Sequence, residues 1–569
     1  MTFVKANGWY QRKNYVAVGP SLGLAWSPNA TSELGKAFLG SGNRSVFRIG
    51  YRLAFDTISS FQITAAAGRV PGLITTCSSS FPFATISAGC SPVTTPNASL
   101  SGFQKQLAAP TGKPLDGLTA TLQLNTNAPT LTVFAPNMKI PTVHQWSLSF
   151  QRELPGGFAM QAAYIGRRGT RLFNSYNINQ IGSGPILPSF LQLRQNYRNN
   201  CNPNGVGTRP SPNTNVNGGV CANPIAGAQI PLIAQLVSFG LTQAAADTFV
   251  NSANVRGDID LNAAGTFAER LENTVLGFKL RPNQQFSAIT YIDNLGDSNY
   301  HSLQLTLRRR FASGLGLNMA YTFGKSIDNQ SVDPIGAASG GGLSTTNSRT
   351  PTDGFNFRDE RGRSDFDRTH IFTMASVYEL PFGKGRKFWN NTGWADRIVN
   401  GWNVNAIFTT FSGEPFSVRS GVRTANAAHE SRAALLEDTR ASLQPSLTTS
   451  VVGPVYFNST SSFAIPEPGQ SGAGRNIFVS KGYYNLDMGL TKFVALTESV
   501  RLQFRAEFFN ILNHPNFDNP RDATVGSPSF RSSVFAQACC ATVGPPSTQS
   551  IIQTGESGRV IQFALKLQF

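Results

Sequence analysis

Strict alternation of apolar and polar residues is the feature of this sequence that most restricts its fold. The last eleven residues read RVIQFALKLQF. In an extended chain, Ile561, Phe563, Leu565, Leu567 and Phe569 would lie on one side, and polar or small residues would lie on the other. A period of two predicts a β-strand. Chain ends are usually polar and loose, so a two-faced strand ending on phenylalanine needs an explanation.

The same alternation recurs along the chain, for example in VFRIGYRLAF (46–55), QWSLSFQR (145–152), SLQLTLRRRF (302–311) and RLQFRAEFF (501–509). Most of these segments have the roughly 9–11 residues that a tilted strand needs to cross a membrane. The pattern predicts eleven strands, near 16–26, 46–57, 143–152, 157–178, 300–311, 315–324, 369–380, 401–419, 483–493, 500–509 and 559–569.

The connections between these predicted strands alternate in length. Long segments lie near 58–142, 179–299, 325–368, 420–482 and 510–558, and shorter connections, including 27–45 and 381–400, lie between them. If the last strand runs toward the periplasm, every long segment falls outside and every shorter one inside. Outer-membrane barrels combine short periplasmic turns with long outer loops. We therefore predict an all-β fold, an antiparallel transmembrane β-barrel that occupies residues 1–569 as a single domain.

Composition narrows the class further. Charged residues make up 14% of the chain, against roughly 25% in soluble proteins, and no apolar run reaches the ~18 residues of a membrane-spanning helix. The mean hydropathy is −0.15, which suits strands whose lipid-facing and lumen-facing residues alternate. A secreted soluble protein built from β-sandwiches remains an alternative.

The net charge of +17 suits an anionic partner such as lipopolysaccharide phosphates. The sequence contains no recognition helix, RNA-binding aromatic motif or zinc spacing, so nucleic acid is not an expected partner. Two stretches of the long segments have helical spacing, 231–250 and, more weakly, 187–200. The glycine-rich stretch 336–344 is expected to be mobile.

Six cysteines lie in or next to polar segments. Cys77 and Cys90, and Cys201 and Cys221, form two close pairs, and Cys539 and Cys540 are adjacent. Such pairs are candidate loop disulfides of an oxidising compartment, although six unrelated thiols would have the same spacing. The first residues contain no apolar segment typical of a signal peptide, so either the chain stays in the cytoplasm or its true start lies upstream. The cysteine pairs favour the second option.

The densest polar cluster is FRDERGRSDFDRTH (357–370). One interpretation is a cation or sugar site at the barrel mouth, or a surface that contacts a plug. The other, which the interleaving of opposite charges favours, is a salt-bridged rim. The candidate residues are Asp359, Glu360, Arg361, Arg363, Asp365, Asp367, Arg368 and His370.

Catalytic motifs are lacking. The five histidines are scattered without metal-ligand spacing, and the sequence has no Gly-x-Ser-x-Gly elbow and no phosphate-binding loop. We therefore predict neither enzymatic activity nor a cofactor or metal.

Several stretches together carry a family resemblance: PSLGLAWSP, HQWSLSFQRELPGGFAMQAAYIGRRGTRL, SNYHSLQLTLRRRFASGLGLNMAYTFGKSID, SDFDRTHIFTMASVYELPFGKGRKF, GWNVNAIFTTFSGEPFSV and RLQFRAEFFNILNHPNFDNP. In order and spacing, and over nearly the whole chain, the sequence resembles the C-terminal barrel part of Oar-like TonB-dependent outer-membrane transporters. The resemblance implies uptake of a scarce solute, such as an oligosaccharide, peptide or metal chelate, in contact with outer-membrane lipid. It also implies that the outer-membrane assembly machinery reads the last strand through Phe563, Leu565, Leu567 and Phe569.

The sequence also departs from this family. Its members begin with a signal peptide, a small regulatory-like β domain, a TonB-contact segment and a plug domain, and none of these is visible here. An antiparallel barrel needs an even number of strands, large transporters have about 22, and the predicted count is odd. We therefore expect a C-terminal fragment that is inactive alone and would reach the TonB complex only through a missing N-terminal plug region. A structural or adhesive surface protein with partner-binding loops is the alternative function.

Overall fold

The computed structural model of the chain describes residues 17–29, 32–40, 44–56, 79–80, 85–86, 130–136, 138–201, 231–275, 278–284, 286–331, 351–390, 393–436, 448–450, 453–457, 460–497, 500–517, 520–521, 529–531, 535, 537–538 and 558–569. All five long segments predicted from the sequence therefore lie largely or partly outside the described residues. The glycine-rich stretch 336–344 lies wholly outside them.

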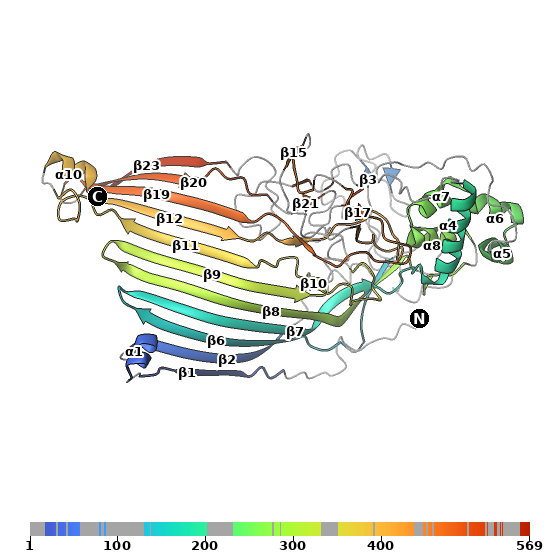
Figure 1. The fold of residues 1–569 in the computed structure, drawn as a ribbon, viewed down its shortest axis with the longest axis horizontal. Coiled ribbons are helices and arrows are strands. Elements are labelled where there is room, and N and C mark those ends of the chain that lie inside the picture. The colour runs from blue at the N-terminus through green and yellow to red at the C-terminus, as the bar shows by residue number, and fades with distance from the viewer. Residues whose placement is uncertain are drawn as a thin grey trace, which may run out of the picture.

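One large sheet dominates the fold (Figure 1), and its eleven principal strands follow one another in chain order. Every neighbouring pair on this path is antiparallel. The predicted number of strands is confirmed. They are β1 (Ser21–Trp26), β2 (Ser45–Phe55), β6 (Thr142–Leu154), β7 (Phe158–Asn177), β8 (Ala288–Ala312), β9 (Leu315–Asp328), β11 (His370–Glu379), β12 (Trp402–Phe411), β19 (Tyr483–Ala495), β20 (Arg501–Phe509) and β23 (Val560–Gln568).

Several strand boundaries differ from the prediction, and one additional strand joins the sheet at its β8. Strand β8 begins at Ala288 rather than near 300, because its outer half pairs with the end of β7 across two bulges that the polar sequence DNLGDSNY does not signal. Strand β12 ends at Phe411 rather than near 419. Inside the segment predicted as a loop at 58–142, β5 (Thr130–Phe134) pairs in parallel with the start of β8. The loops at 58–142 and 179–299 are therefore shorter than predicted.

The connections lie at the two ends of the sheet as predicted. Figure 1 shows the short helices α1 (Glu33–Leu39) and α10 (Trp394–Val399) at the same end as the C-terminus. These helices belong to the shorter connections, and the tight turns between β6 and β7 and between β8 and β9 lie at that end too. The long connections emerge at the opposite end.

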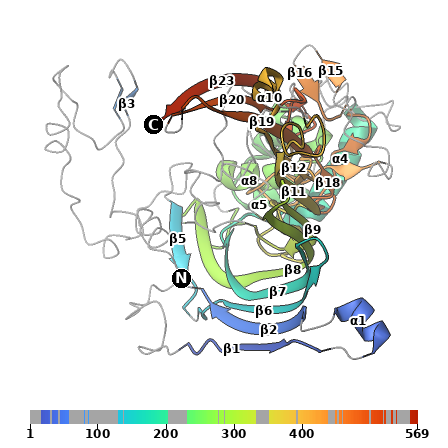
Figure 2. The same cartoon turned by 90° about the vertical axis from the view of Figure 1, so that its left-hand side faces the viewer.

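Viewed along the strands, the sheet is an arc that is open on one side (Figure 2), with β1 and β23 as its two edges. Closure into a complete barrel is not observed in the described part of the chain. The arc has the curvature of a barrel wall, which follows from the regular twist between paired strands.

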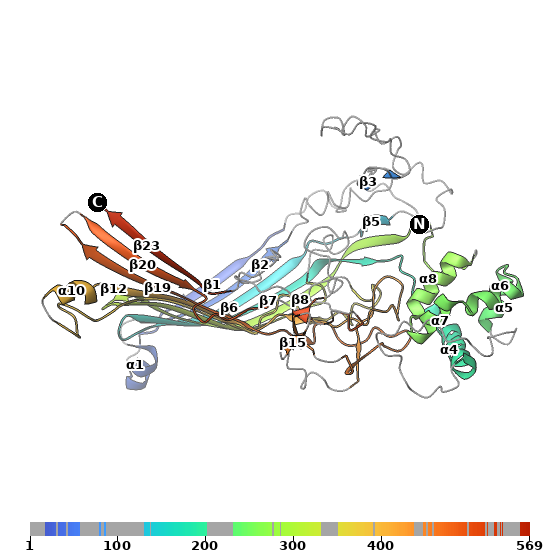
Figure 3. The same cartoon turned by 90° about the horizontal axis from the view of Figure 1, so that it is seen from above.

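Five helices form a separate layer beyond the long-connection end of the sheet (Figure 3). They are α4 (Leu187–Cys201), which follows the 3₁₀ turn η1 (Gly184–Ile186), and α5 (Pro231–Ser238), α6 (Gln243–Val250), α7 (Ala253–Asp260) and α8 (Ala264–Thr274). The helix expected over 187–200 is confirmed. The one expected over 231–250 is divided, because Gly240 has a φ of +100° and the Thr242 side chain caps the start of α6.

The helical layer has its own apolar core, in which Phe190, Leu236, Phe267 and Leu271 are fully buried. A second core gathers Phe416, Tyr456, Phe457, Phe463 and Phe478 from the segments between β12 and β19. The long connections also contain short strands: β3 (Ser79–Ser80), β4 (Thr85–Ile86), β10 (Gly362–Arg363), β13 (Pro415–Phe416), β14 (Ala434–Leu435), β15 (Thr448–Ser450), β16 (Gly453–Val455), β17 (Phe463–Ala464), β18 (Phe478–Val479), β21 (Pro520–Arg521) and β22 (Gln537–Ala538).

Candidate functional site

The pairing register aligns the apolar rows of all eleven strands on one face of the sheet. Many of these side chains are exposed, including Ile49 at 56%, Leu148 at 50% and Leu565 at 71%. A continuous exposed apolar surface of this width fits contact with lipid. Taken strand by strand, the row includes Leu24, Ile49, Leu148, Tyr164, Leu303, Phe323, Met374, Phe408, Leu486, Phe508 and Phe563.

The opposite face is mostly polar. It carries arginines such as Arg48, whose Nη1 donates to Gln151 Oε1 at 2.9 Å. Serine, threonine, asparagine and glutamine fill much of the rest. Several large apolar side chains interrupt it. Val377, Ile407 and Phe493, between β11 and β19, are 42%, 55% and 43% exposed, and Phe509 and Val560, on β20 and β23, are 43% and 54% exposed. This face can therefore border water over most of its area, with apolar regions between β11 and β19 and at the ends of β20 and β23.

Beyond the long-connection end, a buried ion network joins segments that are far apart in sequence. Arg432 Nη1 lies 2.8 Å from Glu360 Oε1, and both side chains are 2% exposed. The same carboxylate oxygen accepts a hydrogen bond from the Thr352 backbone N–H at 2.8 Å. The Thr352 hydroxyl accepts from both Arg419 at 3.0 Å and Arg432 at 2.8 Å. Ion pairs and hydrogen bonds thereby join residues 351–360 to residues 419–432. We call the packed segments beyond the long-connection end of the sheet the outer layer.

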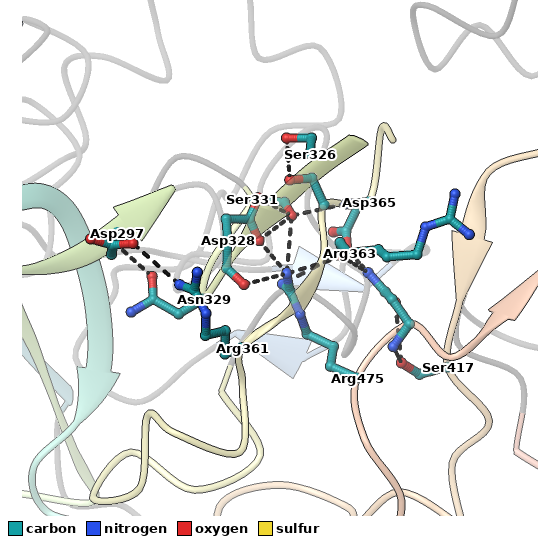
Figure 4. Close-up of polar contacts among 12 residues, drawn as sticks. Asp297, Ser326, Asp328, Asn329, Ser331, Arg361, Arg363, Asp365, Ser417 and Arg475 are labelled. Atoms are coloured by element: carbon teal, nitrogen blue, oxygen red, sulfur yellow. Dashed lines mark hydrogen bonds and ion pairs between the residues drawn. The ribbon is translucent and has the colours of Figure 1, made fainter. Parts of the chain in front are cut away.

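A second network is centred on Arg475 (Figure 4), which pairs with Asp328 and donates to the Arg363 carbonyl oxygen at 3.2 Å. Ser331 Oγ donates to Asp328 Oδ2 at 2.8 Å and accepts from the Asp365 N–H at 2.9 Å. Asp328 ends β9, so this network attaches the outer segments directly to the sheet.

Electrostatics of the two networks follow from burial and pairing. Burial alone would raise the pKa of Glu360, but the charges of Arg432 and Arg419 and the Thr352 N–H outweigh it and lower that pKa below its ordinary value. Burial and the nearby Arg432 charge lower the pKa of Arg419 to about 10. Burial opposes the charge of Arg475, yet Asp365, Asp328 and Glu360 raise its pKa. These groups are therefore charged at neutral pH and are bound to one another.

The candidate cluster at 359–370 is distributed over several partners. Asp367 and Arg363 pair at 2.7 Å, and Asp365 accepts from Asn476 at 2.7 Å. Asp359 accepts from Ser471 at 2.7 Å. The remaining contacts of the cluster are Arg361 with Asp297 at 3.2 Å, Arg368 with Glu414 and with the Phe411 ring, and His370 with Tyr321 at 2.8 Å.

Sequence reasoning did not identify Arg419, Arg432 and Arg475, which organise these networks. Each is a single arginine in a polar segment, and arginine is seldom fully buried. The only sequence signal was indirect, because buried carboxylates in the 357–370 cluster need cationic partners.

The last strand, β23, forms one edge of the arc and pairs with β20 along the side that faces into the sheet. Its apolar row is largely uncovered: Phe563, Leu565, Leu567 and Phe569 are 68%, 71%, 44% and 92% exposed. The reading of this row by an assembly machinery remains a prediction. Five of the six cysteines, Cys77, Cys90, Cys221, Cys539 and Cys540, lie outside the described residues, as does the side chain of Cys201, so the candidate disulfides are also still predictions.

Within the described residues, no cluster of histidine, cysteine, aspartate and glutamate side chains could hold a metal ion. Nor does any helix of the described part combine the length and the apolar character needed to cross a membrane.

The chain was compared with known proteins. Similar solved structures include the outer membrane transporter YddB from Escherichia coli, with 8% identity and a TM-score of 0.36 over 94% of this chain and 39% of that one. The FrpB iron transporter from Neisseria meningitidis gives 8% identity and a TM-score of 0.32 over 97% and 39%. The siderophore receptor PiuA from Acinetobacter baumannii gives 7% and 0.31 over 96% and 35%.

The chain spans less than half the length of these structures. No curated protein matches it significantly. The sequence does match the family described as outer membrane beta barrel domain, over residues 3–562. This match, together with the two-faced antiparallel sheet, establishes the location of the protein in the outer membrane. The chain belongs to the outer membrane β-barrel domain family.

Proposed function

We propose that this chain forms part of the wall of a TonB-dependent transporter of the Oar-like kind, which takes up a scarce solute such as an oligosaccharide, peptide or metal chelate. One observation carries the proposal: eleven strands present one apolar and one polar face, and described parts of their long connections pack into two apolar cores at one end. A wall of this kind gives a wet passage and an outer capture surface, and it performs no catalysis.

The polar face supports a water-filled interior, because Arg48, Arg52 and their amide and hydroxyl neighbours need water or polar partners. The exposed side chains of Val377, Ile407 and Phe493 on the same face favour a plug inside the wall. A plug that packed there would remove these three side chains from water.

The remainder of the wall would come from further strands. With eleven antiparallel strands, β1 and β23 run in the same direction and cannot close on each other as an antiparallel pair. Open strand edges are not tolerated in lipid. We therefore infer that an odd number of additional strands, together with the plug, completes the barrel, and that the 569-residue chain does not transport alone.

The partners follow from the same proposal. The apolar face would contact outer-membrane lipid, and the outer rim lipopolysaccharide. The row at Phe563, Leu565, Leu567 and Phe569 would be read by the outer-membrane assembly machinery, since an exposed strand edge can add to another sheet. The TonB complex would act only through the plug region. The outer layer would select the solute, because its buried ion pairs hold the loops in one arrangement.

An uptake assay tests the proposal. The chain joined to an N-terminal plug region with the complementary strands is expected to import a labelled solute only when TonB is active. The 569-residue chain alone, produced at the same level in the outer membrane, is expected to give no import. TonB-dependent import by the chain alone would refute the proposal that the chain does not transport by itself. Solute binding without TonB-dependent import by the joined protein would instead favour an adhesive or structural surface protein.

A further inference from the structure

Three tyrosine–histidine pairs recur on the apolar face of the sheet. Tyr51 Oη lies 2.8 Å from His144 Nδ1, Tyr164 Oη lies 2.8 Å from His301 Nδ1, and Tyr321 Oη lies 2.8 Å from His370 Nδ1. Each pair joins neighbouring strands: β2 and β6, β7 and β8, β9 and β11. In each, the histidine stands opposite the residue two places after the tyrosine. All three pairs are exposed.

The three pairs also lie at one height. Each tyrosine is the seventh residue of a strand that starts at the short-connection end, and each histidine stands level with the ninth. When the paired residues are followed across two strands, each tyrosine–histidine pair lies two residues closer to the start of its strand than the preceding pair does. With a rise of about 3.3 Å per residue and about 4.8 Å between strands, that setback corresponds to a tilt of about 35°, as in barrels. The pairs therefore form a belt parallel to the membrane.

Two permanent cations lie on the same face, two residues closer to the long-connection end than the ninth position of each strand. Arg168 and Lys325 are both the eleventh residues of their strands, β7 and β9. Arg168 pairs across the ladder with His144, and Lys325 with His301. At the same tilt, the ninth residues stand about 22 Å and the cations about 27 Å above the strand starts, at the edge of an apolar band about 25 Å tall.

The local charge is positive. Lys325 is exposed and makes no ion pair within the described part of the chain. Arg168 lies 3.9 Å from Asp297, a carboxylate that is closer to Arg361, at 3.2 Å. When the tyrosine hydroxyl donates to Nδ1, the ring proton of the histidine lies on Nε2, which can then donate to an anion. Cations and oriented N–H donors thus stand together at the level of lipid headgroups.

We propose that this outer rim, made of Arg168, Lys325, His144, His301 and their tyrosine partners, binds the phosphates of outer-leaflet glycolipid, as found on lipopolysaccharide. The inference deepens the proposed function and rests on its orientation, with the long connections outside. Ordinary aromatic side chains at a membrane interface would need neither the two cations at one level nor the repeated tyrosine contact to Nδ1. Bidentate arginine and the ammonium of lysine are the side chains that suit phosphate groups.

The test measures lipid retention by the full chain after its gentle extraction from outer membranes, with bisphosphorylated lipid A as the probe. Each cation near a membrane surface strengthens anionic lipid association about fivefold. The double variant Arg168→Gln/Lys325→Gln is therefore expected to retain lipid A about 25-fold less tightly. Both side chains are exposed, so folding should be unaffected. Tyr164→Phe, which removes one hydroxyl that fixes the His301 tautomer, should give a smaller loss.

The matched control is Arg48→Gln/Arg52→Gln, which removes two cations from the opposite face of β2. It should leave lipid A retention within twofold of the unaltered chain. Dephosphorylated lipid A should bind no better to the unaltered chain than to the Arg168/Lys325 double variant, and phosphatidylglycerol should compete poorly. Equal losses in the two double variants, or equal retention of dephosphorylated lipid A, would overturn the assignment. These measurements do not involve import, so a failure of the lipid-binding proposal can be distinguished from a failure of the transport proposal.

Discussion

The substitution Glu360→Gln is expected to loosen the outer layer without disturbing the sheet. Glutamine keeps the size of the side chain and can still accept the hydrogen bond from the Thr352 N–H, which is 2.8 Å from Glu360 Oε1. It removes the charge that faces Arg432, whose side chain is 2% exposed. The guanidinium would then stay buried without its carboxylate, because its other described partners, the Thr352 hydroxyl and the carbonyl oxygens of Asp359 and Ala473, are uncharged.

The magnitude follows from the burial of this pair. Two unit charges about 4 Å apart interact by about 4 kcal/mol at an effective dielectric constant of about 20. Removing one partner from a buried pair typically costs about 3–5 kcal/mol, because the other charge is left desolvated. We expect the free energy of local opening around 418–433 to fall by that amount. Since about 1.4 kcal/mol corresponds to a factor of ten, amide protection should fall by about 100- to 4000-fold.

Hydrogen exchange measured by mass spectrometry on the protein in detergent micelles provides the assay. The informative amides include Arg432, which donates to Ser471 at 3.0 Å, and Ser420, which donates to Ser431 at 2.9 Å. Peptides from β7 and β8 should keep their protection, because the strand ladder does not involve Glu360.

The control is the same chemical change at an exposed pair. Glu467 Oε2 lies 2.8 Å from Arg194 Nη1, but its side chain is 56% exposed. Glu467→Gln should cost less than about 1 kcal/mol, because solvent screens exposed ion pairs. If Glu360→Gln lowers protection no more than Glu467→Gln does, the buried network does not hold the outer layer, and the reasoning fails.

Three further predictions concern other parts of the molecule. Gly265→Ala should destabilise the docking of α8 by about 1–3 kcal/mol in exchange measurements, because a Cβ there would lie 2.1 Å from the backbone oxygen of residue 426, whereas Gly257→Ala, which meets nothing within 4 Å, should be neutral or stabilising. Burial and the charge of Arg419 lower the pKa of His429 to about 4, so outer-layer stability should decrease as the pH falls from 6.5 toward 4, and His429→Gln should abolish that decrease in a pH series of exchange rates. Lys492→Met should make the connection 380–401 sensitive to limited proteolysis, because the ammonium donates to two carbonyl oxygens there at 2.7 and 2.8 Å; an unchanged cleavage rate would contradict this.

The main sheet was predictable because alternation along a strand directly reports which side chains face lipid. Where a strand extends beyond the membrane, that requirement ends. The first half of β8 contains Asp293, Asn294 and Asp297, and it is a strand because β7 continues beside it and β5 pairs with its first residues. No local pattern in those residues could have indicated this pairing.

The outer layer was predictable only in part. The carboxylates Glu360 and Asp367 were recognised as members of a charged cluster, and the structure buries both. The depth of Glu360 was not predictable, because it depends on Arg419 and Arg432, which lie 59 and 72 positions further along the chain. A buried charge is stable only with its partner in place, so burial here is a property of the assembled layer and not of any single segment.

The arrangement of these charges also fixes the order in which the molecule can form. Arg475 pairs with Asp328, the last residue of β9, and contacts the backbone of Arg363 in β10, which itself pairs with β9. These partners are brought together only once β9 and β10 have paired. Burying Arg475 before that point would leave its charge without a carboxylate, which is strongly unfavourable. The outer layer must therefore assemble on a sheet that already exists, so the position of the long connections is set by the strands and not by the connections alone.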